Sequence, residues 1–257
     1  SVNEKFAKVN VRTKVVLPEG ADPAKYSMET SVWNPNKQKL TAVRTSLAQM
    51  KYNNNQAEQE FVIQAPSLWS PEMPALYSAE TRLYEGDKLK DIYTTPFGIR
   101  SIEIIPDKGF FLNGKRTVFK GVCNHHDLGP LGAAVNDAAI RRQIRILKDM
   151  GCNAIRTSHN MPAPELIRAC DEMGMMIMAE SFDEWNVAKC KNGYNLLFDE
   201  WAEKDLVNLL HNFRNNPSVV MWCIGNEVPN QWNEGDCKIA KWLQDICHRE
   251  DPTRPVT

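Results

Sequence analysis

The second half of the chain repeats one pattern, and this repeat constrains the fold more than any other feature. After residue 118 an apolar strand, a polar cluster and an amphipathic helix follow one another four times. The expected strands are Val118–Val122, Ala154–Arg156, Met175–Ala179 and Val219–Ile224. Successive strand–helix units imply a parallel sheet, because parallel neighbours need a long crossover connection. The last strand is apolar at every position, so we expect both of its faces to be covered.

The helices between these strands have recognisable ends. Asp137 is expected to cap the first helix, which Gly151 closes. Pro164 lies in the first turn of the second helix and Gly174 ends it. A third helix is expected near Phe198–Asn212. The fourth has apolar residues at helical spacing, namely Ile239, Trp242, Leu243 and Ile246.

The first half of the chain instead shows short alternating runs separated by turn residues. The expected strands are Val9–Val16, Tyr26–Trp33, Leu40–Met50, Glu60–Gln64, Leu76–Tyr84 and Lys88–Thr94. Within Tyr26–Trp33, alternate residues share one face, as a half-buried antiparallel strand requires. This pattern favours an immunoglobulin-like β-sandwich with a structural role. We expect it to occupy residues 1–105 and the strand–helix units to occupy 106–257.

Every polar cluster follows a strand at its carboxyl end, where β/α barrels carry their chemistry. The sharpest cluster is Asn226-Glu227, after the fourth strand. A carboxylate at the mouth of a buried strand suits glycoside hydrolysis, because partial desolvation favours the protonated acid that donates to a departing oxygen. Asn226 can hydrogen-bond a sugar hydroxyl near the reacting carbon. Asp183 and Glu184, after the third strand, either orient basic neighbours or are simply solvated.

Four units make half of an eight-stranded barrel, so we expect a partial TIM-type β/α barrel in a fragment of a longer protein. A complete open sheet of four or five strands is the alternative. In the half barrel, the first and fourth strands would each have an open edge. We expect these edges to be covered locally or to pair with another copy, which leaves a homo-oligomer open.

Several ordered stretches resemble glycoside hydrolase family 2, which includes β-galactosidases, β-glucuronidases and β-mannosidases. The stretches are Leu68-Trp-Ser-Pro-Glu-Met-Pro-Ala-Leu-Tyr77, Thr95-Pro-Phe-Gly-Ile-Arg100, Phe111-Leu-Asn-Gly-Lys115, Lys120-Gly-Val-Cys-Asn-His-His126, Asn153-Ala-Ile-Arg-Thr-Ser-His159, Asp171-Glu-Met-Gly-Met175 and Asn216-Pro-Ser-Val-Val-Met-Trp-Cys-Ile-Gly-Asn-Glu227. The resemblance covers nearly the whole chain. It implies a jelly-roll domain before this chain, then the immunoglobulin-like domain and the catalytic barrel.

The resemblance also implies a role for each matching residue. Glu227 would be the acid/base of a retaining β-glycosidase, and Asn226 its neighbour on the sugar. Arg156 would lie near the nucleophile, while His159 and His125 would line the sugar pocket. The family's nucleophile is a glutamate past Thr257. Within the chain Glu180 is its nearest stand-in, but the resemblance gives Glu180 no such role, so we expect the chain to be inactive alone. A β-galactosidase is the first choice.

Composition narrows the partners. The formal net charge of −1 gives no bias towards nucleic acid, and no apolar run approaches the roughly 18 residues that span a bilayer. A carbohydrate is the expected partner, with no cofactor and no metal. The seven cysteines suggest mostly reduced, buried thiols. The first residues lack an apolar signal core, and the compartment stays open.

Two other classes of function remain as alternatives. One is a non-catalytic carbohydrate-binding or scaffold protein. The other is a metal-dependent barrel hydrolase that uses His125, His126 and His159 near Cys123, although adjacent histidines on an extended segment point apart. Trp185 and Trp232 could stack on a sugar or pack in the protein. The core is expected to contain Trp201, Trp222 and Trp242.

Overall fold

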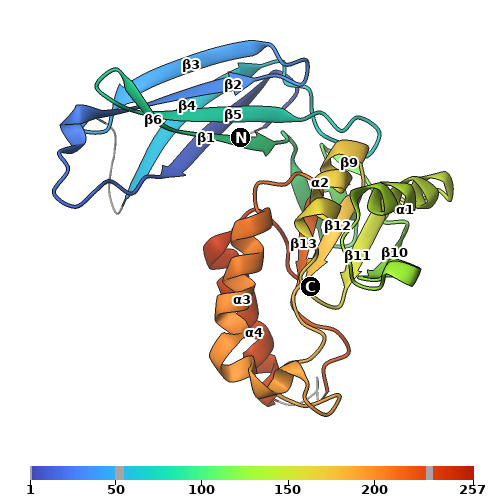
Figure 1. Ribbon diagram of the computed structural model, residues 1–257. Coiled ribbons are helices and arrows are strands. Elements are labelled where there is room, and N and C mark those ends of the chain that lie inside the picture. Colours follow the sequence, from blue (N-terminus) through green and yellow to red (C-terminus); the bar gives the residue numbers. More distant parts are fainter. Residues whose placement is uncertain (1, 50–54, 230–233) are drawn as a thin grey trace. The chain divides into compact units, whose positions relative to one another are not determined.

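The computed structural model describes residues 2–49, 55–229 and 234–257, without the side chains of 235 and 236. The chain forms two compact units. The first comprises Ser1–Trp69 and Ala75–Ser101, and the second Ser70–Pro74 and Ile102–Thr257. The first unit is an immunoglobulin-like β-sandwich, and the second contains a partial TIM-type barrel (Figure 1).

The sandwich consists of two antiparallel sheets. A two-stranded sheet pairs β1 (Phe6–Lys14) with β4 (Gln56–Gln64). A four-stranded sheet has the order β3 (Lys39–Ser46), β2 (Tyr26–Trp33), β5 (Tyr77–Glu85) and β6 (Lys88–Phe97). Inward residues of both sheets form the core, where Val32 packs with Phe61 and Ile63. Met28 packs with Ala57 in a second cluster, so alternation along the strands builds the unit as predicted.

The sequence placed β2 correctly at both ends, but β4 starts earlier than predicted. Its first residues are mostly polar, yet Ala57 is fully buried and Gln59 is only 5% exposed. The Gln59 amide donates to the carbonyl of Val43, at 3.1 Å. A side-chain amide bonded in this way can occupy an inward position, which a search for apolar alternation misses.

The second unit begins with a small antiparallel sheet that the sequence did not indicate. It contains β7 (Ile102–Ile105), β8 (Gly109–Leu112) and β9 (Lys115–Arg116). The parallel sheet then follows in the order β10 (Gly121–His125), β11 (Ala154–Ser158), β12 (Met176–Glu180) and β13 (Val219–Cys223). This sheet confirms the prediction of four successive strand–helix units.

The first strand of this sheet lies three residues later than predicted. The Asn153 side chain accepts from the Lys120 amide, at 2.8 Å, and donates to the Val118 carbonyl, at 3.0 Å. These bonds hold residues 118–120 outside the ladder. The strand then starts at Gly121, where an added Cβ would lie 2.1 Å from the carbonyl oxygen of Ala154.

Four helices follow the strands and bury one stripe each. They are α1 (Asp137–Asp149), α2 (Pro164–Met173), α3 (Phe198–Phe213) and α4 (Glu234–Glu250). Asn136, not Asp137, caps α1, because its side chain accepts from the Ala139 amide at 3.0 Å. Gly174 ends α2 in a left-handed conformation, as predicted, and a Cβ there would meet the Pro71 carbonyl oxygen at 2.2 Å.

The core of the second unit lies between the sheet and its helices. Both faces of β13 are covered as predicted, since Val219, Val220 and Trp222 are fully buried. The prediction that Trp201 and Trp242 belong to the core is wrong, because they are 42% and 37% exposed. The Lys204 ammonium lies 4.3 Å from the Trp201 ring centroid, and the Trp242 ring meets the Phe198 ring edge to face with centroids 6.2 Å apart.

The expected open edge beside β13 does not exist. Residues 255–257 run parallel to it, with the Trp222 amide donating to Pro255 at 3.0 Å and the Thr257 amide donating to Trp222 at 2.9 Å. A buried ion pair of Asp251 and Arg254, at 2.5 Å, precedes this segment. The edge of the fourth strand is therefore covered locally.

Arg254 fastens this segment to the sheet. Its Nε donates to the carbonyl of Val219 at 2.7 Å, and Nη2 donates to Arg214 and Asn216, each at 3.0 Å. The Trp222 indole donates to Asp251 at 2.9 Å. The side chains of Asp251 and Arg254 are only 4% and 5% exposed, so water contributes little to their solvation.

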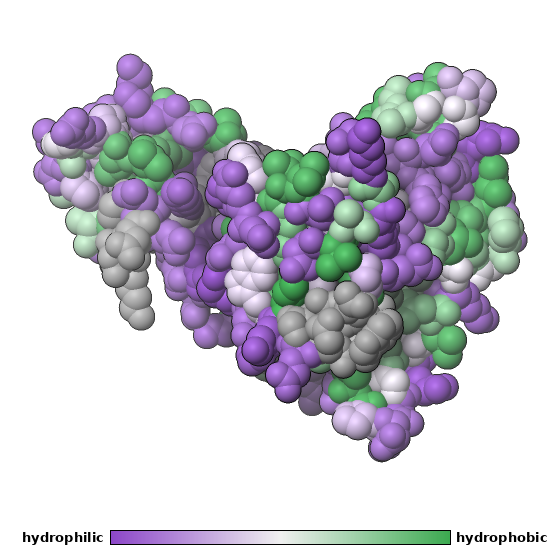
Figure 2. Space-filling model, turned by 90° about the horizontal axis from the view of Figure 1, so that it is seen from below, coloured by the Kyte–Doolittle hydropathy of each residue, from purple (hydrophilic) through white to green (hydrophobic). Residues whose placement is uncertain are grey.

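The surface is mixed in character. Figure 2 shows one face on which hydrophilic side chains predominate and hydrophobic ones lie in separate groups. No helix in the described ranges is long and apolar enough to cross a membrane. All seven cysteines are free thiols, of which Cys170, Cys223 and Cys247 are buried, so burial holds for fewer of them than predicted.

Candidate active site

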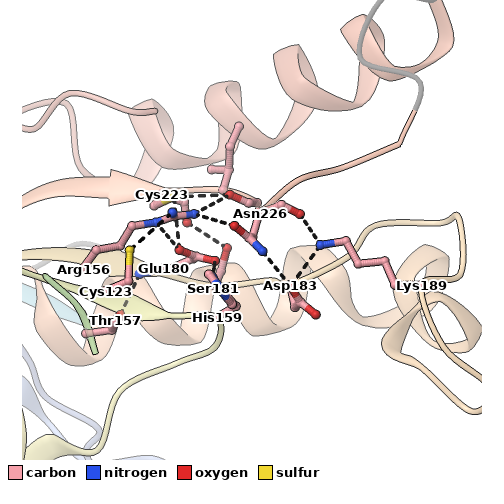
Figure 3. Close-up of polar contacts among 12 residues, drawn as sticks. Cys123, Arg156, Thr157, His159, Glu180, Ser181, Asp183, Lys189, Cys223 and Asn226 are labelled. Atoms are coloured by element: carbon pink, nitrogen blue, oxygen red, sulfur yellow. Dashed lines mark hydrogen bonds and ion pairs between the residues drawn. The ribbon is translucent and has the colours of Figure 1, made fainter. Parts of the chain in front are cut away.

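The carboxyl ends of β11, β12 and β13 bring the predicted polar residues together. Arg156 lies on β11, opposite Cys123 of β10, and Glu180 ends β12 opposite Cys223 of β13. Figure 3 shows Arg156, Glu180 and Asn226 directed toward one another across these strands. The parallel register therefore gathers side chains that are up to 70 residues apart in sequence.

Glu180 is the buried centre of this cluster. Its side chain is fully buried, with Oε2 2.6 Å from Nε of Arg156 and Oε1 2.8 Å from Nδ1 of His159. The thiol of Cys223 lies 3.6 Å from Oε2, and burial together with the Glu180 charge raises the pKa of this thiol. Both carboxylate oxygens are occupied, so Glu180 orients Arg156 and His159 and is not free to attack a substrate.

Asn226 is fixed by partners of opposite character. Its Oδ1 accepts from Nη2 of Arg156 at 3.2 Å, and its Nδ2 donates to Oδ1 of Asp183 at 3.0 Å. A guanidinium only donates and a carboxylate only accepts, so these two contacts define the orientation of the amide. Burial would raise the pKa of Asp183, but hydrogen bonds from Asn226 and Lys189 outweigh it and the pKa is lowered.

Side-chain hydrogen bonds to backbone carbonyl groups hold the turn between β13 and Glu227. Four consecutive carbonyl oxygens each accept a hydrogen bond from a side chain. The donors are Ser181 to Cys223 at 3.2 Å, Trp185 to Ile224 at 2.7 Å, Arg156 to Gly225 at 3.4 Å and Lys189 to Asn226 at 2.5 Å. All four donors come from β11 or from the loop after β12, so neighbouring strands shape this turn.

Glu227 follows this turn in an unusual conformation. Its φ is +42°, a left-handed value that is uncommon outside glycine. Its side chain is exposed, and no described residue lies within hydrogen-bond distance of its carboxylate. The partial desolvation that the sequence suggested is therefore not provided by the described residues, because the carboxylate lies one turn beyond the buried strand.

The histidines occupy separate positions. The rings of His125 and His159 meet edge to face, with centroids 5.0 Å apart. His126 points elsewhere, with Nε2 2.9 Å from the carbonyl oxygen of Ala133. In the described ranges no group of three or more His, Cys, Asp or Glu residues is placed to hold a metal ion. The geometry thus places His125 and His159, but not His126, beside the Glu180 cluster.

The acidic residues after β12 have different partners. Asp183 pairs with Lys189 at 3.0 Å, as one of the predicted alternatives has it. Glu184 instead binds backbone amides, accepting from Lys189 at 2.6 Å and Asn195 at 2.9 Å. Gly193 packs against it so closely that a Cβ would lie 1.9 Å from its oxygen. Glu184 therefore fixes the loop that carries Lys189.

Of the two tryptophans considered for sugar stacking, the structure describes one. Trp185 is 6% exposed, and its indole donates to the Ile224 carbonyl. It also packs against Gly225, where a Cβ would lie 2.9 Å from its Nε1. Trp185 is therefore a packing residue under the turn. Trp232 lies outside the described residues.

Sequence reasoning missed two residues that shape the site. Lys189 lies in an irregular segment without periodicity. Asp171 is buried at the end of α2 and accepts from the Ser218 amide at 2.9 Å and from Asn216 at 2.5 Å, which sets the start of β13. Asp171 acts on a backbone amide and a side-chain amide, and Lys189 binds the Asn226 carbonyl as well as Asp183, so neither role has a local sequence pattern.

Comparison with known proteins gives matches along both units. Residues 103–257 match the TIM barrel domain of glycosyl hydrolases family 2, and residues 1–100 match a second profile of glycosyl hydrolases family 2. Among curated relatives, the chain is 43% identical over 234 residues to "Beta-galactosidase BoGH2A" of Bacteroides ovatus, covering 91% of this chain and 27% of that protein. It is 40% identical over 207 residues to a "Putative beta-glucuronidase" of Formosa agariphila, covering 80% and 19%.

Solved structures agree with the sequence matches. A glycosyl hydrolase family 2 member from Bacteroides cellulosilyticus superposes with a TM-score of 0.88 at 35% identity, covering all of this chain and 33% of that one. A β-glycosidase from Bacteroides vulgatus gives a TM-score of 0.87 at 35% identity, covering 100% and 31%. The chain thus spans about a third or less of the length of each of these four proteins.

Proposed function

Because the chain belongs to glycoside hydrolase family 2, we propose that it supplies the acid/base half of a retaining β-glycosidase site, with Glu227 as the acid/base. The observation that carries the proposal is the turn after β13. It presents an exposed carboxylate beside an amide whose orientation is defined by Arg156 and Asp183. The names of the relatives as β-galactosidase and β-glucuronidase support the same reaction class.

In the proposed mechanism Glu227 acts twice. As a carboxylic acid it protonates the glycosidic oxygen while the bond to the sugar breaks. As a carboxylate it then removes a proton from the water that hydrolyses the glycosyl-enzyme, so that the configuration is retained. An exposed position suits both steps, because a leaving group and a water molecule must reach the same carboxyl.

The neighbouring residues bind the sugar in this proposal. The amide nitrogen of Asn226 carries two hydrogens, and Asp183 takes one, which leaves the other for a sugar hydroxyl. Arg156 and His159 are held by Glu180, so they meet the substrate in fixed positions. The His125 ring lies against the His159 ring and belongs to the same side of the proposed sugar site. The partner is thus a carbohydrate.

Retention also needs a second carboxyl about 5–5.5 Å from the first. Among the described residues near the turn, Glu180, Asp183 and Glu184 are all engaged by cations, amides or backbone groups. We therefore place the nucleophile outside residues 1–257, and the 257-residue chain alone should show no turnover. A β-galactoside is the preferred substrate in this proposal, and comparing hydrolysis of aryl β-galactosides and β-glucuronides tests it.

The acid/base role is tested in the full-length protein that contains this chain. Glu227→Gln should lower kcat/KM for an aryl β-glycoside by about 10²–10⁴-fold, because general acid–base catalysis contributes that much. Glu103→Gln, at an exposed carboxylate of β7, is the matched control and should be neutral. Sugar binding without hydrolysis, both in the unchanged full-length protein and in its Glu227→Gln variant, would favour the non-catalytic alternative. Turnover by the 257-residue chain that Glu227→Gln abolishes would contradict the placement of the nucleophile.

A further inference from the structure

Lys189 lies in the loop after β12 and touches the turn that carries Glu227. Its Nζ donates to the carbonyl oxygen of Asn226 at 2.5 Å and to Oδ1 of Asp183 at 3.0 Å. We propose that Lys189 is a positioning residue that holds the carboxyl of Glu227 where it can protonate a leaving group. The inference rests on the proposed acid/base role of Glu227.

The contact acts on the peptide bond next to Glu227. The carbonyl of Asn226 and the amide nitrogen of Glu227 belong to one planar unit, so fixing the oxygen fixes the plane from which Glu227 extends. Glu227 has a left-handed φ of +42°. Such a backbone conformation persists only where surrounding contacts hold it. Lys189 supplies the contact closest in sequence to Glu227.

Lys189 is itself fixed at both ends. Its backbone amide donates to the buried carboxylate of Glu184, and its ammonium is paired with Asp183. The side chain is only 21% exposed. Asp183 also accepts from the Asn226 amide. Lys189 is therefore linked to the side chain of Asn226 through Asp183, and its Nζ binds the Asn226 backbone carbonyl directly. Figure 3 shows this closed arrangement.

Among the four donors to the turn, Lys189 is the most informative to change. Arg156 also contacts Glu180 and belongs to the proposed sugar site, and Trp185 is part of the core. Within the described ranges the Lys189 ammonium bonds to the turn and to Asp183, and not to Glu180, Arg156 or His159. A change there alters the support of Glu227 and leaves the contacts of Glu180 with Arg156 and His159 in place.

The test uses two aryl β-glycosides of the same sugar in the full-length protein. A phenyl glycoside needs protonation of its leaving group, whereas a 2,4-dinitrophenyl glycoside does not. Lys189→Met should lower kcat/KM for the phenyl substrate by about 10–100-fold, the effect of a misplacement near 1 Å, and change the dinitrophenyl substrate little. Lys189→Arg, which keeps the charge and donors, should recover most of the loss.

Lys241 provides the matched control, because it forms an exposed ion pair with Asp245 on α4. Lys241→Met should leave both substrates unchanged. If Lys189→Met fails to fold, Lys189→Gln carries the same prediction, since glutamine is too short to reach both Asp183 and Asn226. Hydrogen exchange of the peptide 224–229 should be faster in the Lys189 variant than in the control.

The outcomes separate this inference from the proposed function. A phenyl-substrate defect in Glu227→Gln together with wild-type behaviour of the Lys189 variants would overturn the positioning role alone. An equal loss on both substrates would also overturn it, because that pattern indicates general damage. Wild-type leaving-group dependence in Glu227→Gln would instead overturn the acid/base assignment, whatever the Lys189 variants do.

Discussion

The two units place their charged residues differently. In the sandwich the ion pairs lie outside the core: Lys8 and Glu60 are 50% and 56% exposed, and they pair across β1 and β4. In the barrel unit the charges enter the interior, where the side chain of Glu180 is fully buried and that of Arg254 is 5% exposed. The sandwich buries mainly apolar side chains, whereas the barrel unit also buries the charged side chains of Asp171, Glu180, Glu184, Asp251 and Arg254.

The two units are therefore stabilised by different kinds of interaction. Apolar packing depends on shape and tolerates small shifts, while a buried charge must find its partner or remain uncompensated. The barrel unit therefore depends on individual polar contacts more than the sandwich does. We expect single substitutions to show this contrast, in order of decreasing effect.

Arg254→Met should have the largest effect on stability. It leaves Asp251 buried without its cation and removes the donors to Val219, Arg214 and Asn216. Breaking a buried pair from one side costs about 3–5 kcal/mol. Urea unfolding of the second unit measures the loss. If Arg254→Met lowered the free energy of unfolding by less than about 1 kcal/mol, as for an exposed pair, the barrel unit would not depend on buried charges more than the sandwich does.

Met28→Ala tests the corresponding element of the sandwich. Met28 is fully buried between the sheets, next to Ala57 and Leu47. Truncation leaves a cavity and should cost about 3 kcal/mol, within the range for buried methionine. The control is Met150→Ala, at a side chain that is 68% exposed and should tolerate the change. Equal costs at the two positions would contradict the packing assigned to the sandwich core.

Acid should weaken the barrel unit before the sandwich. Burial alone would raise the pKa of Asp251, but the Arg254 charge and hydrogen bonds from Thr253 lower it. A carboxyl with a lowered pKa stabilises the fold fully above its unfolded pKa, near 3.9, and this contribution is lost as the pH falls through the folded value. Unfolding followed from about pH 5 down to about pH 2 measures the slope, and Asp251→Asn should flatten it.

The exposed pair in the sandwich should have the smallest effect. Lys8→Ala and Glu60→Ala, combined in a double-mutant cycle, should give a coupling energy under about 1 kcal/mol, because both side chains are half exposed. High salt should reduce even this value. A coupling as large as the cost of Arg254→Met would show that the sandwich also depends on its charges.

The same contrast explains how much the sequence could predict. Periodicity identified β2, the four strand–helix units and the end of α2 at Gly174, because apolar burial and left-handed turns leave local traces. It placed Asp137 at the helix cap where Asn136 has the role, since two capping residues stand side by side and only geometry distinguishes them. It missed β7, β8 and β9, which are too short for a periodic pattern.

The site was predictable in its residues but not in its contacts. Glu227, Asn226, Arg156 and His159 follow from strand ends and from family resemblance, and their roles remain proposals. The roles of Lys189 and Arg254 could not be predicted, because besides one carboxylate each they bind backbone carbonyl groups, which every residue carries. Glu180 was recognised at a strand end, but its pairing with Arg156 depends on strand register, which no local pattern records.

The four carbonyl groups of residues 223–226 that accept side-chain hydrogen bonds make the turn dependent on strand pairing. Their donors reach the turn only after β11 and the loop following β12 lie beside β13. Without β11 and the loop after β12 beside β13, these oxygens would be left to water and the turn would lose its shape. The turn that carries Glu227, the proposed acid/base, therefore takes its shape only when β11, β12 and β13 are paired.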